Sequence, residues 1–387
     1  MSFGSRQEVV GRLRRRYERA GRVYRQRLIG QLCEVCGYER KYAIKVLNGN
    51  RSGPRGLARG GGQQRYAAPE RVVLAQIWRW GDYPCGKRLV AMLPLWLSAY
   101  ERRRGVLDEA VRQRLLGISA ATADRLLAAE RAHGRQRRGG TKPGGLLRTQ
   151  IPVRCESWNV DRPGYLEADS VDHGGQSTAG SYVHSLTFTD IFSGWVEQDA
   201  VWNKGAAGVM RAIRQIEADV PFAILGFDSD NGAEFINHHL LRYFRCRAAP
   251  VDFTRSRAYR KNDNAHVEQK NWSKVRQLLG YERFDQYELV EIVHALYRGP
   301  WRLLQNFFQP VMKLTHKHRR GGRVHKRYDR AQTPAQRLLA WEGLRTDKRA
   351  WLLHLQATLD PVALTEAVDR QCQQLRRILR EGRRHAA

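Results

Sequence analysis

The chain has 387 residues, 42% of them hydrophobic, and carries 68 Lys and Arg against 38 Asp and Glu, a formal net charge of +30. This length predicts two to four domains with packed cores, and the charge indicates a polyanionic partner. The sequence shows no signal peptide and no apolar run long enough for a bilayer, so we expect no membrane association. Six scattered cysteines without a disulfide framework favour a reducing cytoplasm.

The excess positive charge lies in the two flanks of the chain. Residues 1–150 have a net charge of +21, residues 151–305 of −2, and residues 306–387 of +11. A near-neutral centre between basic flanks predicts a folded core between nucleic-acid-binding arms. The alternative is a basic surface that serves only solubility.

Residues 1–50 are predicted to form helices over 6–16, 28–36 and 38–47. The last two helices surround a turn at Gly37, which predicts a helix-turn-helix DNA-binding domain. The third helix offers three basic side chains to a major groove: Arg40, Lys41 and Lys45. The alternative is a plain helical hairpin with a solvated basic face. Cys33 and Cys36 have no second ligand pair for zinc, so we expect them to pack between helices.

Residues 51–65 form a basic Gly/Arg linker, in which Arg55 and Arg59 are candidates for minor-groove contacts. A simple tether is the alternative. Residues 66–132 are predicted to be a second helical helix-turn-helix domain, with Ser119 as the N-cap of its recognition helix. Thr122 and Arg125 lie near the start of that helix and are further candidates for DNA contacts. A second basic linker follows over residues 133–150.

From residue 151 the pattern changes to alternating strands and helices. Strands are predicted over 165–171, 182–190, 195–201, 222–228 and 250–254. Helices are predicted over 206–219, 234–244, 264–279 and 287–308. Three strands followed by alternating helices and strands predict an α/β core over residues 151–308, with a mixed five-stranded sheet flanked by helices.

Residues 309–387 are predicted to be a basic DNA-binding or assembly region. The stretch 313–330 predicts a small β-hairpin or an extended arm, and helices are expected over 334–340 and 361–380. The whole chain is therefore expected to be multidomain, with all-α domains, an α/β core and a basic C-terminal region.

Three acidic residues in the near-neutral core are candidate metal ligands: Asp169, Asp230 and Glu268. The first two lie at the ends of predicted strands, and the third lies on a predicted helix. Asn231-Gly232 predicts a tight turn that exposes the carboxylate of Asp230, although Asp228 shares its strand face. Carboxylates that converge in this way suit a pair of Mg²⁺ ions, which can drive in-line displacement at a phosphodiester.

Other polar residues near Glu268 are candidates for DNA contacts. Asn264 lies four residues before Glu268, so the two would share a helix face. Three lysines surround this position and are suited to phosphate binding: Lys261, Lys270 and Lys274. Solvated surface charge is the alternative for each of them.

Four motifs carry a resemblance to a known family: Leu166-Glu167-Ala168-Asp169; Thr187-Phe188-Thr189-Asp190 followed by Gly194-Trp195; Asp228-Ser229-Asp230-Asn231-Gly232-Ala233-Glu234-Phe235; and Lys261-Asn262-Asp263-Asn264-Ala265-His266-Val267-Glu268-Gln269-Lys270-Asn271. Together they resemble the DDE transposases of bacterial insertion sequences, within the retroviral-integrase-like superfamily. The resemblance covers about residues 155–300. The separation of 38 positions from Asp230 to Glu268 slightly exceeds the commonest family spacing.

The resemblance implies an RNase H-like core and a two-metal polynucleotidyl transferase. Asp169 would bridge two Mg²⁺ ions, Asp230 would hold one and Glu268 the other, with Mn²⁺ as a substitute. The implied protein binds the terminal inverted repeats of its own insertion sequence, cleaves their ends, and joins the 3′-hydroxyls to target DNA. It would work at the bacterial nucleoid as a homodimer or higher oligomer on double-stranded DNA. A nuclease without joining activity and a non-enzymatic DNA-binding regulator are the alternatives.

Overall fold

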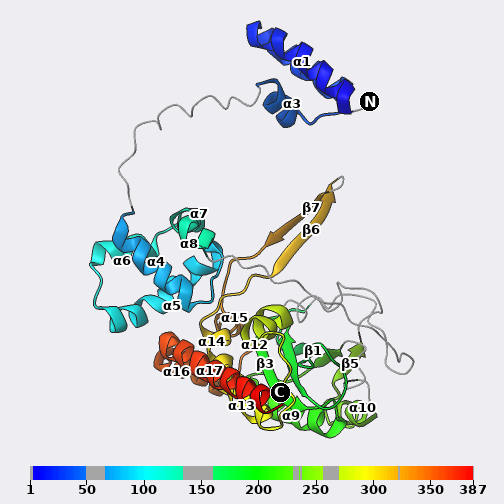
Figure 1. Ribbon diagram of the computed structural model, residues 1–387, viewed down its shortest axis with the longest axis vertical. Helices are drawn as coiled ribbons and strands as arrows, with labels where there is room; N and C mark the ends of the chain where they lie inside the picture. Colours follow the sequence, from blue (N-terminus) through cyan, green and yellow to red (C-terminus); the bar gives the residue numbers. More distant parts are fainter. Residues whose placement is uncertain are drawn as a thin grey trace. The chain divides into compact units, whose positions relative to one another are not determined.

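The computed structural model describes residues 3–48, 66–133, 160–229, 235, 238–255, 270–320 and 323–386. The chain divides into two compact units, Met1–Arg65 and Tyr66–Ala387 (Figure 1). None of the helices in the described ranges combines the length and the apolar character needed to cross a bilayer.

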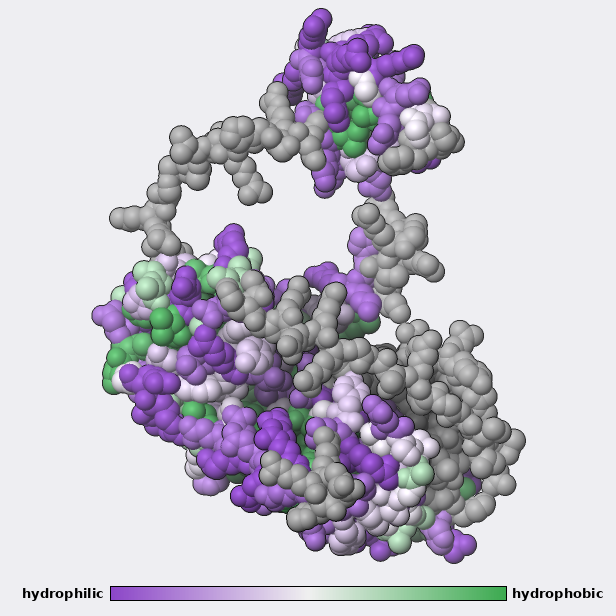
Figure 2. All heavy atoms as spheres, in the orientation of Figure 1, coloured by the Kyte–Doolittle hydropathy of each residue, from purple (hydrophilic) through white to green (hydrophobic). Residues whose placement is uncertain are grey.

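The described residues of the first unit form the helices α1 (Phe3–Arg19), α2 (Arg22–Cys36) and α3 (Arg40–Leu47). The predicted N-terminal helical region is therefore present. Gly37 ends α2 at a φ of 66°, a left-handed conformation that suits glycine. A small core holds the helices together, and Cys36 is buried in it. Figure 2 shows the unit as mainly hydrophilic on its surface around a few hydrophobic side chains.

The second unit begins with five helices: α4 (Ala68–Trp80), α5 (Gly86–Arg104), α6 (Glu109–Leu116), α7 (Ala120–Leu126) and α8 (Ala128–His133). Buried Glu70 accepts a hydrogen bond from Ala67 N and pairs with Arg114, which ties the start of α4 to α6. Ser119 caps α7 as predicted, because its side chain accepts from Thr122 N. The predicted helix over 120–130 is divided at Leu127.

The central sheet has five strands in the described part of the chain, in the order β3-β2-β1-β4-β5. These are β1 (Tyr165–Asp172), β2 (Val183–Asp190), β3 (Val196–Trp202), β4 (Gly226–Ser229) and β5 (Asp252–Arg255). The pairs β1–β2 and β2–β3 are antiparallel, whereas β1–β4 and β4–β5 are parallel. This confirms the predicted mixed five-stranded sheet. β4 is shorter than predicted, because its pairing with β1 begins only at Gly226.

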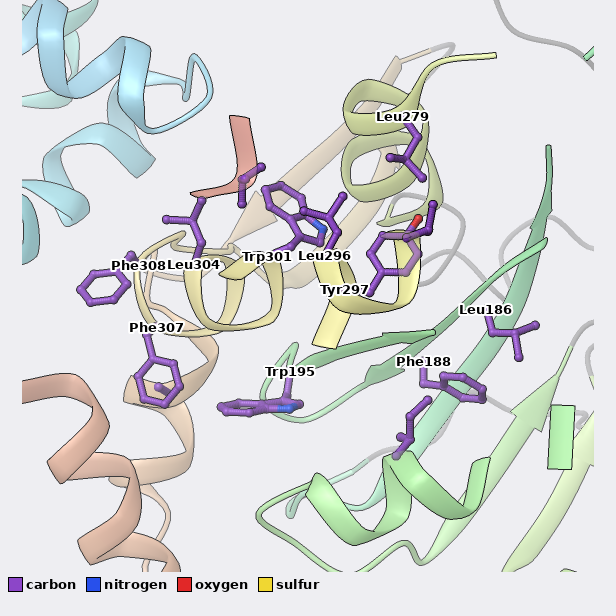
Figure 3. Close-up of a cluster of buried hydrophobic side chains, with 14 of the residues drawn as sticks. Leu186, Phe188, Trp195, Leu279, Leu296, Tyr297, Trp301, Leu304, Phe307 and Phe308 are labelled. Atoms are coloured by element: carbon purple, nitrogen blue, oxygen red, sulfur yellow. The ribbon is translucent and has the colours of Figure 1, made fainter. Parts of the chain in front are cut away.

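Helices pack against this sheet: α9 (Ala206–Asp219), α10 (His238–Arg245), the π-helical segment η1 (Asn271–Arg276), α12 (Gln277–Leu279), α13 (Glu288–Leu296), the π-helical segment η2 (Tyr297–Trp301) and α14 (Arg302–Phe307). Figure 3 shows side chains of α13, η2 and α14 gathered with Phe188 and Trp195 in one core. The single helix predicted over 287–308 is wrong, because Gly299 is non-helical and Pro300 has no N–H to donate.

The C-terminal part begins with a β-hairpin formed by β6 (Leu314–Arg320) and β7 (Arg323–Tyr328). Three helices follow: α15 (Pro334–Ala340), α16 (Thr346–Thr358) and α17 (Pro361–Ala386). α17 packs against α5 and α13. Residues from α4–α7, the sheet and α17 thus share one hydrophobic core.

Candidate functional site

Asp169 lies in β1 at the centre of the sheet, opposite Thr187 of β2. Its side chain is partly buried. One carboxylate oxygen, Oδ1, accepts a 2.8 Å hydrogen bond from Ser170 N, and the other, Oδ2, accepts a 2.6 Å bond from Asn271 Nδ2. The two donors fix the orientation of this carboxylate in the fold.

Two hydrogen bonds hold η1 alongside β1. Asn271 at its start donates to Asp169, and Arg276 Nη2 at its end donates to the carbonyl oxygen of Asp172 at 2.9 Å. The side chain of Asn271 is 8% exposed, and its Oδ1 is buried with no hydrogen-bond partner among the described residues. Asn271 was not predicted as a site residue. The signal that could have found it is its position three residues after Glu268, on the same face of the helix that the sequence predicts over 264–279.

Asp230 and Glu268, the other two predicted ligands, lie outside the described residues. The strand before Asp230 is described as far as Ser229, which pairs in parallel with Ala168. Asp228, the competing carboxylate of that strand, is fully buried and accepts a 2.6 Å hydrogen bond from Thr254 Oγ1 of β5. Within the described ranges no three His, Cys, Asp or Glu side chains form a group that could hold a metal ion.

Lys270 and Lys274, predicted to bind DNA, are half-buried and contact protein groups. Lys270 Nζ lies 3.4 Å from the carbonyl oxygen of Gly194. Lys274 donates to Gln309 Oε1, and its ammonium lies 5.1 Å from the centre of the Trp301 ring. Burial lowers the pKa of Lys274 to about 8 and lowers the pKa of Lys270 well below its ordinary value. Both lysines can therefore lose charge more readily than solvated lysines.

The other predicted DNA contacts have different surroundings. Arg40, Lys41 and Lys45 are all exposed on α3, and Arg40 donates to Gln26. On α7, Thr122 Oγ1 contacts Ser119 and accepts a 3.0 Å bond from Arg125 Nη2. The remaining candidates lie outside the described residues: Arg55, Arg59, Lys261 and Asn264.

Ionisable groups lie near the start and the end of β1, and one of them, Asp190, is fully buried. Asp190 accepts from Gly164 N, Ser193 N and Ser193 Oγ, and its burial raises its pKa to about 6. Asp172 contacts His184 and Lys204. Burial alone would raise the pKa of Asp172, but these two partners outweigh it, and the net shift is downward. Asp190 and Asp172 therefore both make hydrogen bonds or ion pairs within the protein.

Comparison with known proteins finds one extensive sequence relationship. The chain is 40% identical over 336 residues to the uncharacterized protein y4rM of Sinorhizobium fredii (strain NBRC 101917 / NGR234). The alignment covers 85% of this chain and 93% of the relative. No family model matches the chain.

The solved structures that are similar to part of the chain include two retroviral integrase core domains. The catalytic core domain of BIV integrase is 18% identical, covers 45% of this chain and 91% of its own, and has a TM-score of 0.29. The dimeric form of the HTLV-2 integrase catalytic core domain in complex with magnesium is 15% identical. It covers 38% of this chain and 90% of its own, with a TM-score of 0.28.

Proposed function

The chain belongs to the family of the y4rM protein of Sinorhizobium fredii, and we propose that it is a DNA transposase of the DDE type. It binds the terminal inverted repeats of its own insertion sequence, cleaves the phosphodiester at each end, and joins the freed 3′-hydroxyls to target DNA. Its catalytic groups are Asp169, Asp230 and Glu268. It acts at the bacterial nucleoid, in the cytoplasm, as a homodimer or larger assembly on double-stranded DNA.

The observation that carries this proposal is the hydrogen bond between Asn271 and Asp169. It places the segment that follows Glu268 directly against the strand that bears Asp169. Residues three apart on a helix share a face. If the helical turn continues from Asn271 toward Glu268, the second carboxylate comes to the same side of β1 as the first.

The register of the parallel strands supports Asp230 as the third carboxylate. Ala168 pairs with Ser229, so one further residue on each strand would bring Asp169 level with Asp230. Side chains at paired positions lie on one face of a sheet. Asp228 is fully buried and bonded to Thr254. This favours Asp230 over Asp228 as the group that faces substrate.

The groups around Asp169 fit divalent magnesium. Mg²⁺ prefers hard oxygen ligands, and Asp169 supplies a carboxylate beside the buried, unpartnered Oδ1 of Asn271. We infer that Asp169, Asp230 and Glu268 would hold two Mg²⁺ ions, with Mn²⁺ as a substitute. Such a pair, when bound, supplies activation of the attacking oxygen and stabilisation of the leaving oxygen in an in-line displacement.

Neighbouring residues position the carboxylate of Asp169 for this reaction. Ser170 N and Asn271 Nδ2 fix the carboxylate of Asp169, and Arg276 fixes the end of η1 on β1. Such positioning matters because small displacements of reacting groups cost large factors in rate. Water attacks first, and the freed 3′-hydroxyl attacks target DNA second. No Ser or Tyr nucleophile is required for either step.

The remaining parts of the proposal concern DNA. The order of strands and helices supports an RNase H-like core, and the helical regions on its N-terminal side are proposed as tandem helix-turn-helix domains. Phosphate contacts from the basic flanks would supply affinity through counterion release. The proposed contacts are the exposed Arg40, Lys41 and Lys45, together with Arg55, Arg59, Thr122, Arg125, Lys261, Asn264, Lys270 and Lys274.

Replacement of each catalytic carboxylate by its amide tests the proposal. Asp169→Asn, Asp230→Asn and Glu268→Gln should abolish Mg²⁺-dependent cleavage and joining, because each removes a charged ligand without a change in size. End binding should remain. The assay follows both strands of a labelled duplex that carries the terminal repeats flanking the protein's own coding sequence. Asp252→Asn is a matched control, since Asp252 is an exposed carboxylate at the start of β5.

The outcomes distinguish the alternatives. A pre-cleaved end that yields joined product identifies a transposase, whereas cutting without joining identifies a nuclease. Binding with neither activity, in the presence of Mg²⁺ or Mn²⁺, identifies a regulator. Any of the three amide variants that cleaves and joins at the normal rate would remove that residue from the catalytic set.

A further inference from the structure

A basic two-stranded arm extends from the second unit. β6 and β7 pair along their length, and Figure 1 shows them standing clear of the sheet and the helices. All side chains of the arm that the structure describes are exposed: Leu314, Thr315, His316, His318, His325, Lys326, Arg327 and Tyr328. No helix or strand of the described ranges covers these side chains.

The sequence of the arm sets like charges against one another. Residues 314–328 contain six Lys and Arg, three His and no Asp or Glu. The backbone register pairs position 317 with 326 and position 320 with 323, and the sequence has Lys or Arg at all four positions. Like charges directly opposite each other destabilise a strand pair, and an isolated two-stranded hairpin is only marginally stable in water. A polyanion would relieve this repulsion, because no carboxylate within the arm can.

The two faces of the arm differ in chemistry. The rings of His316 and His318 lie 5.5 Å apart, and those of His318 and His325 stack at 5.0 Å with an interplanar angle of 10°. These imidazoles therefore form a column on one face, which Arg327 shares as the register partner of His316, and strand alternation places Lys326 on the other face. Imidazole nitrogens can donate and accept hydrogen bonds, as base edges require.

The base of the arm is fixed to the catalytic sheet. Asp329 accepts from Lys313 N and pairs with Arg337 of α15, both at 2.7 Å. Lys313 Nζ donates at 2.7 Å to the carbonyl oxygen of Phe192. Phe192 lies in the loop that follows β2, the strand paired with β1. A ligand bound by the arm would therefore have a fixed orientation relative to Asp169.

We propose that the β6–β7 arm enters the major groove of duplex DNA, with its histidine face toward the base edges and its lysine face toward the phosphates. The assignment of DNA as the partner rests on the function proposed above. β6 has seven residues, about 23 Å of strand, and paired strands lie about 4.8 Å apart. A major groove about 12 Å wide admits such a ribbon.

Binding of a fluorescein-labelled, mixed-sequence duplex of about 30 base pairs to the full chain tests the proposal by anisotropy. EDTA in the buffer prevents cleavage. The variant Lys326→Ala should bind more weakly, and the slope of log affinity against log salt should fall by about 1, since one phosphate contact from the lysine face is lost. The matched control is Lys348→Ala on α16, which removes the same charge and should have little effect.

A second variant separates the two faces. His316→Ala/His318→Ala/His325→Ala should weaken binding with the salt slope unchanged, because the variant keeps every Lys and Arg of the arm. Duplex RNA of the same sequence has a deep, narrow major groove, so loss of the arm should matter little for RNA. Equal binding by the arm variants and the control on DNA, or equal loss on RNA, would overturn the proposal. Metal-free binding is independent of cleavage, so either proposal can fail while the other stands.

Discussion

At the scale of single residues, Asn271 is the group that links the acidic motif to the observed fold. Its side-chain amide donates a hydrogen bond to Asp169, which joins η1 to β1. In the sequence Asn271 lies three residues after Glu268. We expect Asn271→Ala to lower the cleavage rate and to raise the Mg²⁺ concentration needed for half-maximal activity. Loss of a group that orients a metal ligand costs roughly 10–100-fold in metal affinity or activity.

The measurement for Asn271 is cleavage of end DNA over a range of Mg²⁺ concentrations. Gln277→Ala on α12 serves as the control, because it removes an exposed amide from the same helical segment. A purely structural role would lower stability without a change in the Mg²⁺ requirement. An Asn271→Ala protein with the normal requirement and the normal rate would contradict a positioning role.

His173 is a buried titratable side chain close to the end of β1. Its ring stacks on Phe284 with 4.5 Å between ring centres, and its Nε2 contacts Ser185 Oγ at 2.7 Å. Burial, and after it the charge of Arg276, lowers the pKa of His173 to about 3 from an ordinary value of 6.5. Between these values the unfolded chain binds one more proton than the folded chain. His173 therefore makes the protein less stable as the pH falls below 6.5.

The variant His173→Phe should remove this pH dependence. Ser185 keeps its 2.7 Å contact with Tyr297, so the substitution leaves that hydroxyl partnered. From about pH 7.5 to about pH 5.5, the native chain should lose about 1.4 kcal/mol more unfolding free energy than the variant. Urea denaturation at the two pH values measures the difference. Equal losses in the two proteins would mean that His173 gains its proton in the folded state.

At the scale of elements, the periodicity of apolar residues predicted a helix correctly where those residues form its buried face. The helix over 206–219 was predicted with the observed bounds, because Val209, Ile213 and Ile216 form a clear apolar stripe. The pattern did not predict the kink in η2, where apolar residues flank Gly299-Pro300 on both sides although the helical backbone is interrupted at Gly299. It also missed α16, in which Leu352 is the buried residue, so that the periodic signal is weak.

The candidate site was predictable only in part, and for a physical reason. Asp169 stands out because it is a carboxylate within a strand that the sequence predicts, so its chemistry could be inferred from the sequence. Asn271 does not stand out, because its role depends on a contact with a strand 102 residues away. The same holds for Trp96, whose indole N–H donates at 3.0 Å to the carbonyl oxygen of Phe308. Long-range contacts of this kind follow from the fold and not from local sequence.

At the scale of the whole molecule, the core around Trp96 predicts how the chain unfolds. Trp96 of α5 is fully buried and bonded to Phe308 at the end of α14, in a core shared by α4–α7, the sheet and α17. These elements should therefore unfold in one cooperative step. Met1–Arg65 forms a separate compact unit with its own small core. We expect that unit to unfold in a step of its own, at lower denaturant because its core is small.

The ten tryptophans make this last prediction easy to measure, because all of them lie after residue 65. Tryptophan fluorescence then follows only the second unit, whereas far-UV circular dichroism follows helices of both. In urea the two signals should not coincide, with dichroism changing first. Removal of residues 1–65 should make them coincide and leave the fluorescence midpoint unchanged. A midpoint that falls on truncation would mean that the two units stabilise each other, and a second fluorescence step would mean that α4–α8 unfold apart from the sheet.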